Sequence, residues 1–131
     1  MSLDSAYNTA SQPRTVLLAD DEPTVRVVVE RILRGAGYQV IASESAVHAT
    51  DLAGTHHGGI DVLISDIVMP GLNGVDLAKF VQKSRPDTKV LLISGYFPDG
   101  LEFLEGWKFL RKPFTPRALT ATLATLLEVA A

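Results

Sequence analysis

The stretch that decides the fold is TVLLADDEP, residues 15–23. Residues 15–19 form a short, mostly apolar run with the length and composition of a buried β-strand. Two adjacent aspartates, Asp20 and Asp21, follow it directly, and Pro23 suits the first position of a helix. The stretch therefore predicts a strand that leads into a helix, with two carboxylates at the carboxyl end of the strand.

The rest of the chain continues this alternation. Residues 23–37 carry apolar residues at helical spacing and close on glycines. Further strands are predicted at 38–43, 60–65, 88–94 and 107–111, and further helices at 45–53, 74–86 and 115–131. The last helix is expected to have Thr115 as its N-cap, Pro116 at its first position, and a buried stripe of Leu119, Leu123 and Leu126.

The predicted strands are near-continuous apolar runs, which is typical of a parallel sheet covered by helices on both faces. The fold class predicted is α/β, a doubly wound five-stranded sheet with the flavodoxin-like order 2-1-3-4-5. This order places the second strand at an edge of the sheet, and that strand is followed only by Ser43 and Glu44.

Composition limits the function. The 131 residues suffice for one domain, the formal charge is −3, and no basic block suggests a nucleic-acid surface. The chain has no cysteine, and no apolar run approaches the ~20 residues that span a bilayer. We expect a cytoplasmic protein that contacts neither nucleic acid nor membrane directly. Residues 1–13 are expected to be a disordered lead, a linker or a tag remnant, and residues 14–131 the domain.

Polar side chains collect at the carboxyl ends of the strands, where open α/β sheets bind ligands. Asp20 and Asp21 follow the first strand, Asp66 the third, Ser94 the fourth and Lys112 the fifth. Three neighbouring carboxylates repel one another, and Mg²⁺ is the natural cation to neutralise them. A carboxylate beside Mg²⁺, a lysine and a hydroxyl can act as a nucleophile toward a phosphoryl group.

Four motifs carry a resemblance to a known family. In order they are LADDEP (18–23), ISDIVMPGLNG (64–74), LLISGY (91–96) and FLRKPF (109–114). Together they resemble the receiver domain of two-component response regulators, and most of all the receivers of hybrid sensor histidine kinases. The resemblance covers nearly all of 14–129. It implies a signalling domain that is phosphorylated by a histidine kinase or a histidine phosphotransfer protein, and that catalyses only its own phosphoryl transfer and dephosphorylation.

The resemblance also implies roles for single residues. Asp66 would be the phosphoacceptor. Asp21 would bind Mg²⁺ directly, Asp20 would bind it largely through water, and the backbone carbonyl of Val68 would be another ligand.

Three further positions have implied roles. Ser94 would hydrogen-bond the phosphoryl group in the active state, and Lys112 would pair with Asp66 or its phosphate. Phe109 would be the switch aromatic, which turns inward when Ser94 moves. The Lys112–Pro113 peptide bond is expected to be cis.

Two features depart from the family pattern. Residues 95–106 have room for only about one or two helical turns, so the fourth helix is expected to be short, displaced or partly unwound. The resemblance places Val68 and Tyr96, two residues after Asp66 and Ser94, at positions that would flank the phosphoryl group. An apolar and a bulky side chain there lead to the hypothesis of slow dephosphorylation.

Other interpretations stay open at this point. Asp20 and Asp21 could cap the helix that follows them. The whole domain could be a pseudo-receiver, a protein interaction module without phosphorylation. A haloacid-dehalogenase-type hydrolase would need a second aspartate where Val68 stands, and a flavin binder would need a Ser/Thr/Gly-rich loop after the first strand. Both rank low.

The remaining motifs receive plain interpretations. His48, His56 and His57 are expected to be solvated and not to be metal ligands. The apolar excess of the last helix, including Leu127 and Val129, allows a homodimer or partner face, but ordinary packing is favoured.

Overall fold

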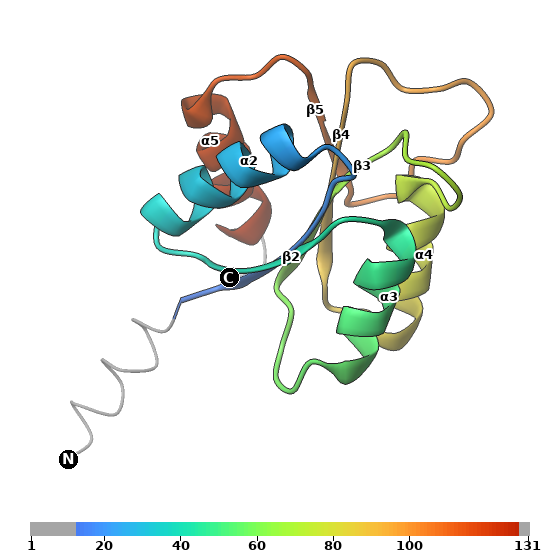
Figure 1. The fold of residues 1–131 in the computed structure, drawn as a ribbon, viewed down its shortest axis with the longest axis horizontal. Coiled ribbons are helices and arrows are strands. Elements are labelled where there is room, and N and C mark those ends of the chain that lie inside the picture. Colours follow the sequence, from blue (N-terminus) through green and yellow to red (C-terminus); the bar gives the residue numbers. More distant parts are fainter. Residues whose placement is uncertain (1–12, 129–131) are drawn as a thin grey trace.

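The computed structural model describes residues 13–128 (Figure 1). Five parallel strands have the order β2-β1-β3-β4-β5. Their bounds are β1 Thr15–Ala19, β2 Gln39–Ser43, β3 Val62–Asp66, β4 Lys89–Ser94 and β5 Lys108–Arg111. Within 13–128 the helices are α2 Pro23–Gly35, α3 Ala46–Thr55, α4 Gly74–Ser84 and α5 Pro116–Glu128. The predicted fold class and strand order are confirmed.

Two expectations fall largely beyond this range. The lead predicted at 1–13 lies outside the described residues except for Pro13, and so does the end of the last helix after Glu128. Among the residues that the structure does describe, no helix is both long enough and apolar enough to span a membrane.

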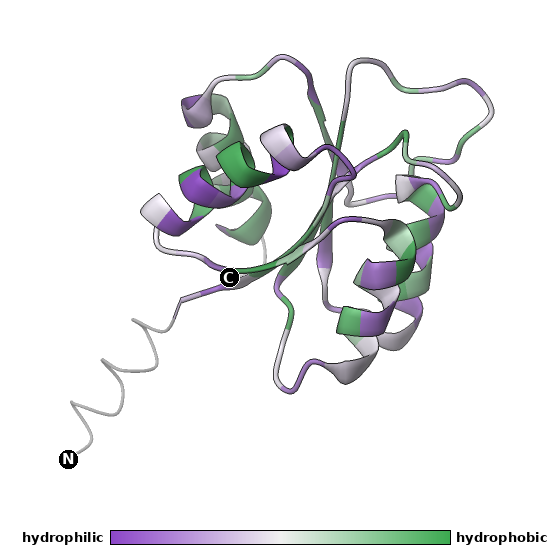
Figure 2. Ribbon diagram, in the orientation of Figure 1, coloured by the Kyte–Doolittle hydropathy of each residue, from purple (hydrophilic) through white to green (hydrophobic). Residues whose placement is uncertain are grey.

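The sheet is the middle of three layers. Helices α2 and α5 cover one face, and α3 and α4 cover the other (Figure 1). Neighbouring residues of β1 serve opposite faces: Val16 and Leu18 pack toward α2 and α5, while Leu17 packs toward α3 and α4. In Figure 2 the strands are mainly green, while the helices carry purple along part of their surface. The strands are buried on both faces, as the near-continuous apolar runs predicted.

The ends of the helices follow the sequence signals. Thr115 caps α5 by accepting a hydrogen bond from the N–H of Ala118 at 3.0 Å, as predicted. The three leucines of the predicted stripe are buried: Leu119, Leu123 and Leu126. Gly37, with φ +98°, follows the end of α2, so the predicted glycine stop is confirmed. Since the α5 leucines pack on the chain's own core, ordinary packing accounts for them.

The connection from β4 to β5 departs most from a regular doubly wound fold. Residues 95–107 are all described, and they form turns without any helix. The expectation of a shortened fourth helix is therefore confirmed, and no helical turn is left in these residues. Two glycines in left-handed conformation, Gly100 at φ +83° and Gly106 at φ +88°, together with Pro98, prevent helical hydrogen bonding there.

Candidate functional site

The site lies at the carboxyl edge of the sheet, where β1 and β3 end side by side. Ala19 of β1 is in register with Ser65 of β3, so the residues that follow these two meet. Asp20, Asp21 and Asp66 each place a carboxylate oxygen within 4.8 Å of the other two. At an effective dielectric constant of 20, such a pair of like charges repels by roughly 3 to 4 kcal/mol. The clustering predicted from the sequence is thus present, and the repulsion among its carboxylates destabilises the fold.

Asp20 is held in place by its own turn. Its carboxylate Oδ1 accepts a hydrogen bond from the N–H of Glu22 at 2.9 Å. Its backbone carbonyl accepts one from Nη1 of Arg26 at 2.7 Å. Burial raises the pKa of Asp20 above its ordinary value, against the opposing effects of the Glu22 N–H and the Lys112 charge.

The alternative that these aspartates cap α2 is wrong. The N-cap residue is Glu22, and no side chain provides a cap hydrogen bond to this helix. The carboxylate of Asp20 bonds within its turn instead. Arg26 was missed by the sequence analysis, because a polar residue in the first turn of a helix carries no signal of what it contacts.

Lys112 supplies the positive charge of the site. Its Nζ lies 2.9 Å from Oδ2 of Asp66 and 3.8 Å from Oδ2 of Asp20. Burial lowers the pKa of Lys112, but the hydrogen bond to Asp66 and the neighbouring carboxylates outweigh it, so this pKa stands above its ordinary value. The lysine is therefore charged at neutral pH. The Lys112–Pro113 peptide bond is cis, as expected.

The backbone around Asp66 is packed tightly. The N–H of Val68 donates to Oδ1 of Asp66 at 3.2 Å. The N–H of Gly74, the first residue of α4, donates to the carbonyl of Ile67 at 2.8 Å. A Cβ at position 74 would lie 2.2 Å from the carbonyl oxygen of Asp66. Only glycine allows α4 to begin this close to β3. The sequence showed a turn here but not this contact.

The two predicted switch residues lie on the neighbouring strands. Ser94 is 3 % exposed and follows Ile93, which is in register with Asp66, so Ser94 reaches the same edge. Phe109 is half-buried in β5 and lies in register with Leu92, farther from this edge. Its ring packs edge-to-face on Phe97, with centroids 5.8 Å apart. The structure thus brings the three aspartates together and pairs Lys112 with two of them, Asp20 and Asp66. Ser94 lies at the same edge of the sheet, and Phe109 lies farther from it.

Beside the site, a mostly apolar groove runs between α2 and the segment that joins β5 to α5. It lies next to the acidic cluster, because Lys112 lines the groove and also pairs with Asp66. The other residues along this groove are Thr24, Val25, Val28, Val29, Ile32, Pro113, Phe114 and Pro116.

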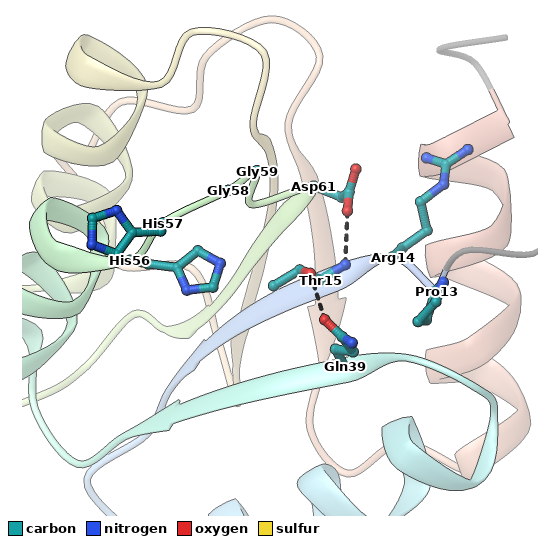
Figure 3. A pocket seen from close by; sticks show the side chains of 9 residues that line it. All are labelled: Pro13, Arg14, Thr15, Gln39, His56, His57, Gly58, Gly59 and Asp61. Atoms are coloured by element: carbon teal, nitrogen blue, oxygen red, sulfur yellow. Dashed lines mark hydrogen bonds between the residues drawn. The ribbon is translucent and has the colours of Figure 1, made fainter. Parts of the chain in front are cut away.

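A separate pocket of about 620 Å³ lies at the opposite edge of the sheet, where the strands begin (Figure 3). Oδ2 of Asp61 accepts a hydrogen bond from the N–H of Thr15 at 2.7 Å, and the hydroxyl of Thr15 donates to Gln39 at 3.3 Å. His56 and His57 also line it. Within 13–128, the acidic cluster is the one group of three or more His, Cys, Asp or Glu side chains close enough together to share a metal ion.

Comparison with known proteins decides the family. The family model described as response regulator receiver domain matches residues 16–124. The chain belongs to this family. It is 36% identical, over 118 residues, to the sensor kinase CckA of Brucella abortus, covering 87% of this chain and 12% of that kinase. It is 30% identical to the response regulator receiver protein CpdR of Brucella abortus, covering 89% of this chain and 99% of that protein.

Solved structures agree. The receiver domain of the hybrid histidine kinase CckA is 34% identical and superimposes with a TM-score of 0.77, covering 86% of this chain and 98% of that one. The response regulator TrrA of Thermotoga maritima, in complex with Mg²⁺ and BeF, is 28% identical with a TM-score of 0.74, covering 87% and 99%. The chain spans a small part of other relatives, for example 21% of the regulator NtrC of Rhizobium meliloti.

Membership of the family fixes the general class of function. Receiver domains are phosphorelay signalling modules, not conventional enzymes, and they pair with histidine kinases. The cluster of Asp20, Asp21 and Asp66 is an acidic triad typical of a Mg²⁺-binding receiver site. Its donors are hard carboxylate oxygens, the ligands that Mg²⁺ prefers, so the residues present fit this metal.

Proposed function

We propose that Asp66 accepts a phosphoryl group from the phosphohistidine of a histidine kinase or a histidine phosphotransfer protein. The contact that carries the proposal joins Nζ of Lys112 to Oδ2 of Asp66 at 2.9 Å, next to two further carboxylates. The lysine places positive charge beside the carboxylate that would attack phosphorus, close to where the phosphoryl oxygens would lie. Two further carboxylates beside a nucleophilic one would repel a phosphoryl group, unless a cation neutralises their charge.

The metal proposed is Mg²⁺. Asp20, Asp21, Asp66 and the backbone carbonyl of Val68 would hold it. When bound, Mg²⁺ supplies positive charge that neutralises the oxygens of the phosphoryl group. The charges of the site support a bound cation, because three carboxylates are clustered there with the single ammonium group of Lys112. The complex of TrrA with Mg²⁺ and BeF is a further support from a relative.

The transfer itself is a displacement at phosphorus. A carboxylate oxygen of Asp66 attacks the phosphorus atom, and the P–N bond of the phosphohistidine breaks. The electron pair of that bond stays on the imidazole nitrogen, which then takes a proton. Lys112 stabilises negative charge on the phosphoryl oxygens throughout, as a fixed donor does in other transfers. The product is an acyl phosphate on Asp66, which water later hydrolyses.

Ser94 and Phe109 would convert this modification into a change of shape. The hydroxyl of Ser94 would move to hydrogen-bond the phosphoryl group, and the Phe109 ring would turn inward behind it. The position of Ser94 at the end of β4, one residue after the register partner of Asp66, supports the first movement. Phe109 lines a surface groove with residues of α5, so its ring is not fully enclosed by the core.

The partner would dock on the apolar groove beside the site. A protein that carries a phosphohistidine must bring it to Asp66 and exclude water around it. The groove between α2 and the β5–α5 connection offers apolar surface continuous with Lys112. Val28, 51 % exposed on α2, is part of that surface. Action in the cytoplasm and assembly into a homodimer remain predictions from the sequence.

The test is intact mass spectrometry after incubation with Mg²⁺ and a phosphoryl donor. Acetyl phosphate, phosphoramidate and a phosphorylated histidine kinase core are the donors, and Asp66→Asn is the control. We expect one phosphoryl group on the parent chain, none on Asp66→Asn and none when EDTA removes Mg²⁺. A parent chain that gains no phosphoryl group from any of the three donors would overturn the proposal.

One observation favours a second function. The absence of a helix in 95–107 alters a surface next to β5, as would suit a pseudo-receiver that binds a protein without being phosphorylated. The same experiment separates the two functions, because a pseudo-receiver would stay unmodified with every donor. The complete set of Asp66, Lys112 and Ser94 favours the phosphoacceptor.

A further inference from the structure

The connection between β4 and β5 is an ordered segment, although it has no helix. Phe97, Leu101 and Leu104 are partly buried and pack against the core on the α3 and α4 side. Trp107, at its end, is 5 % exposed and belongs to that core. The segment therefore replaces helical hydrogen bonds with side-chain packing.

Four aromatic rings in and beside this segment form a continuous row, which we call the aromatic row. Phe109 contacts Phe97 with centroids 5.8 Å apart at 89°. Phe97 contacts Phe103 at 5.5 Å and 85°. Phe103 contacts Trp107 at 6.0 Å and 83°. Each contact is edge-to-face, so a ring that rotates or shifts loses its fit to the next ring. Displacement of a ring at one end should therefore shift the rings along the row.

The two ends of the aromatic row lie on different elements. Phe109 is on β5, and Phe97 follows Ser94 by three residues. At the other end, the indole N–H of Trp107 donates to Oε1 of Gln82 in α4 at 3.0 Å. An ion pair between Lys79 of α4 and Glu102 ties the middle of the segment to the same helix. The row therefore joins the strand of the switch aromatic to α4.

We propose that the aromatic row transmits the phosphorylation state of Asp66 to Trp107 and to the exposed ring of Phe103. The proposal rests on the proposed function, because it requires the Phe109 ring to turn inward. Phe97 is then the coupling residue. Its ring touches both Phe109 and Phe103, so it repacks when Phe109 leaves. Phe103, 45 % exposed, carries the change to the surface where a fourth helix would otherwise stand.

Trp107 provides the readout, because it is the single tryptophan of the chain. Its indole N–H gives one peak in a ¹⁵N–¹H spectrum, and its emission reports its surroundings. The full chain is titrated first with Mg²⁺ and then with beryllofluoride, which mimics a phosphoryl group on a carboxylate. We expect the indole peak to move by more than its line width on beryllofluoride addition, with a change in emission. Asp66→Asn should show neither.

Variants of Phe97 test the coupling. Phe97→Leu removes the ring and should abolish the shift of the Trp107 peak, while phosphorylation of Asp66 by acetyl phosphate continues. Phe97→Tyr keeps the ring and should restore the shift. Phe80→Leu is the matched control, because Phe80 is exposed on α4 and does not belong to the row. Circular dichroism verifies that each variant is folded.

The outcomes separate this inference from the proposed function. Modification of Asp66 in the parent without any shift of the Trp107 peak would overturn the aromatic row as transmitter and leave the phosphoacceptor intact. A shift that persists unchanged in Phe97→Leu would also overturn it. If Phe97→Leu does not fold, the Phe97→Tyr variant decides, and loss of the shift there despite a modified Asp66 refutes the role of ring packing. Absence of modification in the parent refutes both proposals.

Discussion

The Nζ atom of Lys112 lies 2.9 Å from Oδ2 of Asp66, across 46 residues of sequence. These residues are not on neighbouring strands, because β4 stands between β3 and β5. Lys112 reaches over the end of β4, where its backbone N–H donates to the carbonyl of Ser94 at 2.8 Å. Lys112 thereby connects the carboxyl ends of β3, β4 and β5. It also supplies the positive charge beside the carboxylate of Asp66.

Removal of that charge should slow the transfer. Lys112→Ala leaves the developing charge on the phosphoryl oxygens without its fixed donor, and losses of such donors cost about 100-fold in rate. We expect phosphorylation of Asp66 by acetyl phosphate to slow by about this factor, measured as the modified fraction against time by intact mass. Lys108→Ala, at an exposed lysine of β5, should keep the parent rate. An unchanged rate in Lys112→Ala would contradict the role of the lysine.

Without a bound metal ion, the charged carboxylate of Asp20 should destabilise the folded protein. Because burial raises its folded pKa, the stability it contributes is complete below its unfolded value of 3.8 and is lost as the pH rises through the folded pKa. In EDTA, Asp20→Asn should therefore melt above the parent at pH 7, and the gap should open as the pH rises from about 4. Stabilisation by Mg²⁺ should be smaller in this variant than in the parent.

Thermal melts across this pH range test the prediction for Asp20. Asp51→Asn is the control, because Asp51 is exposed on α3 and distant in sequence from the acidic cluster. It should melt like the parent at each pH and keep the response to Mg²⁺. An Asp20→Asn protein that melts below the parent in EDTA at neutral pH would show that the carboxylate stabilises the fold.

Gly74→Ala should disturb the backbone of the phosphoacceptor. The new Cβ would lie 2.2 Å from the carbonyl oxygen of Asp66, so α4 must move, and overpacking of this kind costs about 1–3 kcal/mol. The matched control is Gly54→Ala in α3, where nothing lies within 4 Å, and a gain of about 0.5–1 kcal/mol is expected. Urea unfolding measures both. Equal midpoints for Gly74→Ala and the parent would refute the close contact.

Val28→Asp should separate protein donors from small donors. The charge would stand in the apolar groove that we assign to the partner, so transfer from a phosphorylated histidine kinase core should fall at least tenfold, the effect of about 1.4 kcal/mol. Transfer from acetyl phosphate should not change. Val47→Asp, 65 % exposed on α3 away from the groove, should leave both rates as in the parent. Equal losses with both donors would point to damage of the site itself.

The hypothesis of slow dephosphorylation concerns Val68 and Tyr96. Both side chains are largely exposed, at 51 % and 61 %, and they stand two residues after Asp66 and Ser94. Val68→Asn would offer a polar group to the hydrolytic water, and Tyr96→Ala would open its path. Each should shorten the lifetime of the acyl phosphate, followed by intact mass after removal of the donor. If neither variant shortens it, these residues do not protect the phosphoryl group.

The fold and the composition of the site could be predicted, because both follow from short stretches of the sequence. Each strand is a continuous apolar run, and each polar site residue follows the end of such a run. The order of the sheet then brings Asp20, Asp66 and Lys112 to one edge. The short stretch between Pro98 and Gly106 likewise indicated that a full helix could not form there.

The contacts that could not be predicted depend on tertiary packing. No spacing rule reveals that Gly74 must clear the carbonyl of Asp66, since that requires the position of α4 against β3. Arg26 appears as an ordinary helix residue until its guanidinium is seen at the carbonyl of Asp20. The aromatic row is invisible for the same reason, because its rings are brought together only by the path of residues 95–107.

The most direct test of the central claim is to locate the modified residue. The chain is treated with acetyl phosphate and Mg²⁺, and borohydride then reduces the acyl phosphate to homoserine, which peptide mass spectrometry can place in the sequence. We predict homoserine at position 66 and at no other aspartate. Homoserine at position 20 or 21 with Asp66 intact would contradict the proposed phosphoacceptor, because the lysine contact would then mark the wrong carboxylate.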